Sequence, residues 1–171
     1  MEKAKKIYSI IVNVFLAVAI ILAVLLLGVR LFGLTPYTVL SGSMGKTYPA
    51  GSVVYVVKKD PLTLEVGDVI TFYKEDGKVV THRIIEIIDD DPTAISFRAQ
   101  GDANNTPDDP IPSERVIGKV AFGLPLLGYV VNFIQRPPGN IVAIGFCLLL
   151  VLLSALPELL RKEEDEEKQE E

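Results

Sequence analysis

Two long apolar runs, one near each end of the chain, limit what it can fold into. The first covers residues 7–29, about the ~20 residues that a helix needs to cross a bilayer. The second covers residues 141–156 and reaches that length only if its flanks contribute. The hydrophobic fraction of 49% is high for a soluble protein and typical of a membrane-anchored one. We therefore predict a transmembrane helix near each end and one domain between them.

The first run does not look like a cleavable signal peptide. The apolar core of a signal peptide has roughly 7–15 residues and ends at a small-residue cleavage site. This run is longer and ends in Gly28-Val29-Arg30, without an evident cleavage site. Lysines within residues 1–6 and the Arg161-Lys162 pair beyond the second run favour a cytoplasmic location for both termini. The chain is thus predicted to be an uncleaved, multi-pass protein of the plasma membrane.

These features define five parts of the chain. They are a cytoplasmic N-terminus (1–6), a first transmembrane helix (7–29), an extracytoplasmic domain (30–136), a second transmembrane helix (137–157) and an acidic cytoplasmic tail (158–171). Residues 117–134 are apolar but interrupted by glycine and proline, so we expect them to lie at the membrane surface. The tail from Glu163 onward is charged throughout and is expected to be disordered.

The region between the apolar runs has a β pattern. Short stretches rich in Val, Ile, Phe and Tyr alternate with turn residues, and Asp76-Gly77 indicates a hairpin. The candidate strands are Ser52–Val57, Val69–Tyr73, Val79–Ile88, Ala94–Gln100 and Val116–Phe122. The predicted fold is mostly β: a compact antiparallel β domain flanked by an N-terminal and a C-terminal transmembrane helix.

Three kinds of side chain in this region could carry nucleophilic chemistry. Ser41 and Ser43 flank Gly42, whose backbone freedom could place a hydroxyl in an exposed turn. His82 is the only histidine, and on a strand it would share one face with Val80 and Ile84. A nucleophilic hydroxyl needs a base, and the base needs an acid that holds its tautomer.

Two aspartates are candidates for that acid. Asp102 and Asp108 both lie in a loop rich in Asn and Pro that follows the candidate strand ending at Gln100. Only one of them can accept the His82 ring N–H directly, and the other can order the loop. With Ser43 and His82, they complete the chain order Ser, His, Asp.

Four short motifs, in order, resemble those of type I signal peptidases. They are Ser41-Gly42-Ser43-Met44, Gly67-Asp68-Val69-Ile70, His82-Arg83-Ile84 and Gly101-Asp102-Ala103-Asn104. The resemblance covers about residues 36–129 and is to the archaeal and endoplasmic-reticulum branch, which has histidine where the usual bacterial enzymes have a catalytic lysine. The chain departs from the family after Met44, where Gly45-Lys46-Thr47 replaces the usual acidic residue and proline.

The resemblance implies a role for each candidate residue. Ser43 would be the nucleophile, His82 the general base, Asp108 the histidine partner and Asp102 an essential neighbour. Ser41 would help the Ser43 backbone N–H to bind the oxyanion. Because the usual bacterial enzymes use a lysine as the base, Lys74 is also considered for that role. Arg83 cannot act as a base because its guanidinium stays protonated.

The resemblance also implies an activity and partners. The chain would be a serine endopeptidase that removes signal peptides from secretory and membrane preproteins exported through the Sec translocon. Its partners would be those signal peptides, the lipid bilayer and a nearby translocon, with no cofactor, metal or nucleic acid. The net charge of −5 arises mostly from the tail, and no basic patch indicates nucleic-acid binding.

Other readings of the same residues stay open. Ser43 could be a turn serine, and the aspartates could be turn caps. As a metal ligand His82 would need a carboxylate cluster, because the lone Cys147 lies in an apolar run. The whole chain could be a peptidase of the same fold with a narrow substrate set, such as pilin-like precursors. It could also be a non-catalytic β module that binds exported chains.

Overall fold

The computed structural model describes residues 2–26, 28–91 and 94–170. The chain forms two compact units, which we describe separately. One unit combines residues 1–28 with residues 133–171 and is helical, and the other covers residues 29–132 and contains a β-sheet.

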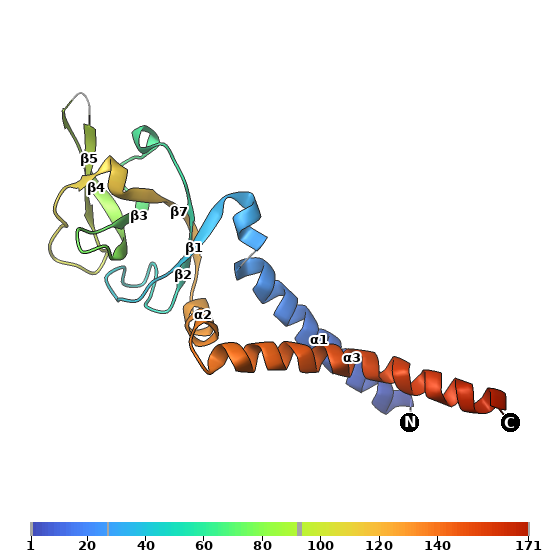
Figure 1. Ribbon diagram of the computed structural model, residues 1–171. Coiled ribbons are helices and arrows are strands. Elements are labelled where there is room, and N and C mark those ends of the chain that lie inside the picture. The colour runs from blue at the N-terminus through green and yellow to red at the C-terminus, as the bar shows by residue number, and fades with distance from the viewer. Residues whose placement is uncertain (1, 27, 92–93, 171) are drawn as a thin grey trace. The chain divides into compact units, whose positions relative to one another are not determined.

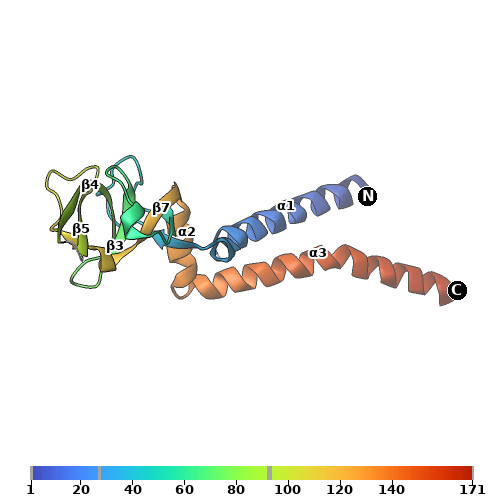
Figure 2. The same ribbon diagram turned by 90° about the horizontal axis from the view of Figure 1, so that it is seen from above.

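The helical unit is built from two long apolar helices, α1 (Glu2–Leu26) and α3 (Gly139–Glu170) (Figures 1 and 2). They run antiparallel: the Tyr8 hydroxyl donates a hydrogen bond to the Leu153 carbonyl at 2.8 Å, and Phe15 packs edge-on against Phe146. By length and composition alone, the stretches Lys6–Leu26 and Gly139–Leu156 are each able to cross a bilayer. The two predicted apolar segments are therefore helical, although α1 begins before residue 7 and α3 extends well beyond residue 157.

The charged tail differs from the prediction. Helix α3 continues through Pro157 to Glu170, so the expectation that the tail from Glu163 lacks regular structure is wrong for residues 163–170. The physical reason is composition, because Glu, Lys and Gln are all strong helix formers. A helix already nucleated by the apolar segment can extend through them at little cost.

The other unit is built on one curled antiparallel sheet of seven strands, labelled in Figure 1. The strands, in sheet order, are β1 (Leu34–Thr38), β2 (Val53–Val57), β7 (Val116–Leu124), β3 (Val69–Tyr73), β4 (Val79–Asp91), β5 (Ala94–Gln100) and β6 (Ile111–Pro112). The five predicted strands are all present, with ends within three residues of those expected.

The two strands that the pattern did not predict are the edges of the sheet. β1 contains Pro36 and β6 contains Pro112. Proline cannot donate a ladder hydrogen bond, so within sheets it is confined largely to edge strands. Proline therefore explains both why the sequence pattern did not predict these strands and why they lie at the edges of the sheet.

Short helices complete the fold. Three are 3-10 helices: η1 (Gly28–Phe32), η2 (Pro61–Thr63) and η3 (Ser113–Arg115). The segment 117–134 contains most of β7, which extends to Leu124, and most of helix α2 (Leu127–Gln135).

Apolar side chains gather on both faces of the sheet. One cluster contains Ile70 and Phe72 of β3 together with Ile84, Phe97 and Ile111. The other contains Val69 of the same strand, with Met44, Val54, Val56 and Val120. Successive residues of a strand point to opposite faces, so β3 contributes to both clusters and is a rigid support for its neighbour β4.

Candidate active site

Ser43 lies in a turn whose position is fixed by the buried side chain of the next residue, Met44. Met44 is completely buried in the second apolar cluster, which fixes the backbone at Ser43. Ser43 itself is half-buried, and its hydroxyl is hydrogen-bonded to that of Ser41 at 3.0 Å. We expected Gly42 to adopt backbone angles that only glycine tolerates. This expectation is wrong, because the glycine with positive φ in this turn is Gly45, at 54°.

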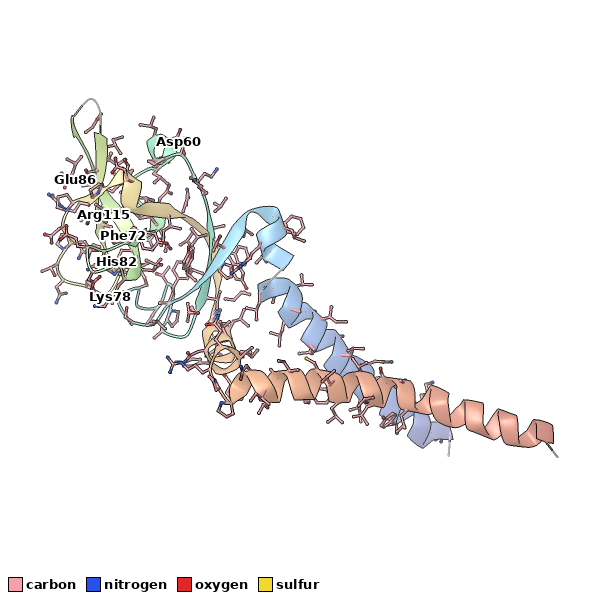
Figure 3. The ribbon with its side chains drawn as sticks, in the orientation of Figure 1. Asp60, Phe72, Lys78, His82, Glu86 and Arg115 are labelled. Carbon is pink, nitrogen blue, oxygen red and sulfur yellow. The ribbon has the colours of Figure 1, made fainter. Side chains whose placement is uncertain are left out.

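His82 projects from β4 into the interior. It pairs with Ile70 of β3 across the hairpin, its exposed fraction is 3%, and its ring packs edge-on against Phe72 with centroids 6.2 Å apart (Figure 3). The predicted hairpin closes as expected, since the Lys74 N–H donates to the Lys78 carbonyl at 2.8 Å. Burial and a rigid strand therefore leave the imidazole little freedom to rotate.

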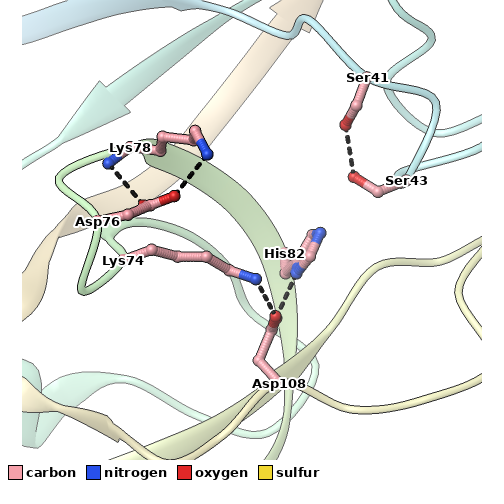
Figure 4. Close-up of polar contacts among 7 residues, drawn as sticks. All are labelled: Ser41, Ser43, Lys74, Asp76, Lys78, His82 and Asp108. Carbon is pink, nitrogen blue, oxygen red and sulfur yellow. Dashed lines mark hydrogen bonds and ion pairs between the residues drawn. The ribbon is translucent and has the colours of Figure 1, made fainter.

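Asp108 contacts His82 directly. Its Oδ2 is hydrogen-bonded to His82 Nδ1, and Lys74 Nζ donates to its Oδ1 at 2.9 Å (Figure 4). Burial raises the pKa of Asp108, but the hydrogen bonds from Lys74 and His82 outweigh that effect and hold it below its usual value. An ionised carboxylate can only accept hydrogen bonds, so the proton in this contact belongs to Nδ1. In the neutral ring, Nε2 then carries a free lone pair.

The free nitrogen of His82 lies close to the backbone of Ser43. A Cβ placed on Gly101 would lie 2.6 Å from the Ser43 carbonyl oxygen and 3.0 Å from His82 Nε2. The Ala103 N–H also donates to that carbonyl at 2.8 Å, which connects the loop after Gly101 to the turn that contains Ser43. Within the described residues, buried Nε2 has no hydrogen-bond partner. It is thus available to accept a proton.

The Ser43 hydroxyl is bonded to Ser41 rather than to His82. In Figure 4 the ring nitrogen remote from Asp108 lies on the side of the imidazole nearer Ser43. Rotation of the Ser43 side chain between staggered rotamers would redirect its hydroxyl, and catalytic hydrogen bonds often tighten only when substrate binds.

Asp102 has a different set of partners. Arg83 donates two hydrogen bonds to its carboxylate, and the Thr47 hydroxyl donates a third at 2.5 Å. The hydrogen bonds from Arg83, together with that from Thr47, hold the pKa of Asp102 below its usual value despite partial burial. Asp102 therefore connects Thr47, in the turn that follows Ser43, to Arg83, the residue after His82 on β4.

Two residues of this site were not predicted in their observed roles. Lys74 was considered only as a substitute base, yet its ammonium binds Asp108. Thr47 belongs to the segment that departs from the family pattern, and its hydroxyl reaches Asp102 from 55 positions away. Hairpin register places Lys74 near His82, but neither pairing has a local sequence signal. Among the described residues, no group of three or more His, Cys, Asp or Glu side chains is placed to hold a metal ion.

A cleft of about 370 Å³ opens beside the two serines. One wall is β1 and the turn after it, from Tyr37 to Ser43, and the other is the start of β4, from Lys78 to Thr81. Among the strands of the described residues, β1 pairs with β2 alone, and the pairing of β4 with β5 begins at Arg83. Strand edges with free backbone groups therefore line the cleft.

The chain is similar in sequence to known signal peptidases. A family model described as signal peptidase, peptidase S26, matches residues 11–91, which include Ser43 and His82. Signal peptidase I W of Bacillus subtilis (strain 168) is 38% identical over 97 residues, covering 55% of this chain and 50% of the relative. This chain thus spans about half the length of that relative. Both matches are thus to signal peptidases, and the family model covers slightly less than half of this chain.

Proposed function

We propose that this chain is a membrane-bound serine endopeptidase that removes signal peptides from preproteins exported through the Sec translocon. The observation that carries the proposal is the convergence at Gly101, where the Ser43 backbone and His82 Nε2 come together while Nδ1 is held by Asp108. The similarity of residues 11–91 to signal peptidases supports the same activity. Histidine at the base position favours the archaeal and endoplasmic-reticulum type over the lysine type.

The proposed reaction uses these atoms in two stages. Ser43 Oγ attacks the scissile carbonyl while His82 Nε2 takes its proton, and Asp108 stabilises the imidazolium that forms. The tetrahedral intermediate collapses when Nε2 returns the proton to the leaving amine, which leaves an acyl ester on Ser43. A water molecule, deprotonated by His82, then hydrolyses this ester and regenerates the serine.

The oxyanion of each intermediate needs donors near Ser43. We assign this role to the Ser43 backbone N–H and the Ser41 hydroxyl, whose oxygen is 3.0 Å from Ser43 Oγ. Loss of one such donor typically raises the barrier by about 2.7–4 kcal/mol.

The cleft suggests how a precursor binds. An extended peptide can add to free strand edges through backbone hydrogen bonds, and side-chain pockets then set specificity. The walls offer free edges at β1 and at residues 79–82 of β4. Tyr37, Leu40 and Val80 are among the residues that line the cleft. We propose that small side chains at the first and third positions before the cut fit shallow pockets here.

The membrane arrangement is part of the proposal. Helices α1 and α3 would both cross the plasma membrane, with the sheet unit outside and both termini in the cytoplasm. In right-side-out spheroplasts, added protease should cut the 51–117 region and spare tags at both termini. Tags that are accessible on opposite sides would refute a second span.

Cleavage of a model preprotein in detergent tests the activity. The expected result is one cut after a small residue at the end of the signal peptide, located by mass spectrometry of both products. A precursor with bulky residues at the first and third positions before the cut should resist. Binding of both precursors without any cleavage would instead favour a non-catalytic module.

A further inference from the structure

Lys74 is bound to the carboxylate of the proposed triad through the oxygen that does not contact His82. Its Nζ lies 2.9 Å from Asp108 Oδ1, while Oδ2 faces His82 Nδ1 (Figure 4). The exposed fractions of the two side chains are 43% for Lys74 and 12% for Asp108. The carboxylate therefore lies between a partly solvated cation and a buried imidazole.

The hairpin between β3 and β4 fixes the position of Lys74. Its N–H donates to the Lys78 carbonyl at 2.8 Å, and the Gly77 N–H donates to the Lys74 carbonyl at 2.9 Å. Lys78, four residues further on, instead pairs with Asp76 inside the turn, at 2.6 Å. One hairpin thus carries two lysines in different electrostatic settings, which gives a matched control.

We propose that Lys74 is a positioning residue that limits the basicity of His82 through their shared contact with Asp108. The ammonium draws the carboxylate charge toward Oδ1, and its positive charge opposes a second positive charge on the imidazole. The free base form of His82 is then populated at a lower pH than Asp108 alone would permit. The inference rests on the proposed function only in treating His82 as the general base.

Other charges near the pair do not replace Lys74. The cavity of about 470 Å³ beside Asp108 is also lined by Glu75, Asp76, Asp109 and Arg115. Arg115 pairs with Glu75 at 3.2 Å, and Asp76 pairs with Lys78. Asp102, beyond this cavity, is paired with Arg83. Lys74 is therefore the cation bound to Asp108 itself.

The lone histidine makes this proposal measurable without any substrate. His82 is the only histidine of the chain, so histidine-labelled protein gives one imidazole signal whose titration by NMR reports its pKa. In Lys74→Met, we expect that pKa to rise by about 0.5–1 unit, because a cation next to the Asp108–His82 pair is lost. Lys74→Arg should restore the parental value, and Lys78→Met should not change it.

Cleavage supplies a second readout. Since the base must be deprotonated, the acid limb of kcat/KM should move to higher pH in Lys74→Met by the same shift. A His82 pKa that stays within about 0.2 unit of the parent, or falls, would overturn the inference. If Lys74→Met fails to fold, Lys74→Gln applies the same test. The NMR measurement needs no cleavage of a precursor. Failure of this inference can therefore be told apart from failure of the proposed function.

Discussion

Arg83 and Asp102 form a two-pronged ion pair, with Nε 2.9 Å from Oδ1 and Nη2 2.8 Å from Oδ2. The same guanidinium donates through Nη1 to the Gly67 carbonyl at 2.9 Å, and Thr47 adds its hydroxyl to Asp102. Four segments that are distant in sequence thus meet at one ion pair. This junction holds the turn that contains Ser43 against the strand that carries His82.

Asp102→Asn should therefore lower stability and turnover together. The neutral amide lacks the negative charge that strengthens the hydrogen bonds from Arg83 and Thr47. We expect the free energy of unfolding to fall by about 1–2 kcal/mol, a modest amount because the ion pair is partly exposed. For a domain of about 100 residues, each kcal/mol lowers the thermal midpoint by about 4–8 °C. Thermal midpoint and turnover measured in the same detergent test this. A fully stable but inactive variant would give Asp102 a chemical role instead.

The same junction gives stability a pH dependence. The folded pKa values of Asp102 and Asp108 are both lowered, so both carboxylates contribute stability that is present above their unfolded value of about 3.9. That stability is lost as pH falls through the lower, folded values. The thermal midpoint of the parent should thus change little above about pH 5 and fall below about pH 4, and Asp102→Asn should show a smaller fall.

Asp108→Asn should separate catalysis from stability. The amide can present its NH₂ to His82 Nδ1, which favours the wrong ring tautomer and leaves Nε2 protonated. In the chymotrypsin triad that exchange costs about 10⁴-fold in kcat. We expect a loss of about 10²–10⁴-fold in a protein that remains folded, with only a modest fall in the thermal midpoint from the lost carboxylate charge. An active Asp108→Asn beside an inactive, stable Asp102→Asn would reverse the assignment of the two aspartates.

His82→Ala should abolish cleavage, with a loss of about 10²–10⁴-fold from removal of general-base catalysis. His82→Lys should give little or no rescue. A lysine there would face the Asp108 carboxylate, which favours the protonated amine, whereas a base must lose its charge. Both variants need a circular dichroism spectrum like that of the parent. Near-normal turnover by folded His82→Ala would refute the triad.

Gly101→Ala tests the convergence of the site directly. A methyl group at Gly101 would lie 2.6 Å from the Ser43 carbonyl oxygen and 3.0 Å from His82 Nε2, so the serine turn and the imidazole must move apart. We expect turnover to fall by about 10²-fold, since small misplacements of catalytic groups are costly. Gly145→Ala is the control, because a Cβ there meets no atom within 4 Å. Parental turnover by Gly101→Ala would argue against the observed proximity.

The local sequence pattern predicted five strands and one hairpin. The edge strands and the side-chain pairings of the site depend on contacts between residues far apart in the sequence. The Val- and Ile-rich runs and the Asp76-Gly77 turn are local signals, and the hairpin follows from them. β1 was missed because Pro36 weakens a strand signal, although an edge position tolerates it. Whether Asp108 or Asp102 faces His82 depends on how a loop returns to β4, which periodicity does not encode. The same holds for Lys74, whose partner lies 34 positions away in the sequence.

The central claim is that Ser43 cuts precursors with His82 as its base, and a comparison of serine variants tests it most directly. Purified parent, Ser43→Ala and the remote control Ser113→Ala would be incubated with one model preprotein in detergent, and release of the signal peptide measured. We predict that the parent and Ser113→Ala cleave at equal rates, and that Ser43→Ala falls by about 10⁶-fold, to background, by analogy with subtilisin. Cleavage by folded Ser43→Ala at the parental rate would contradict the account.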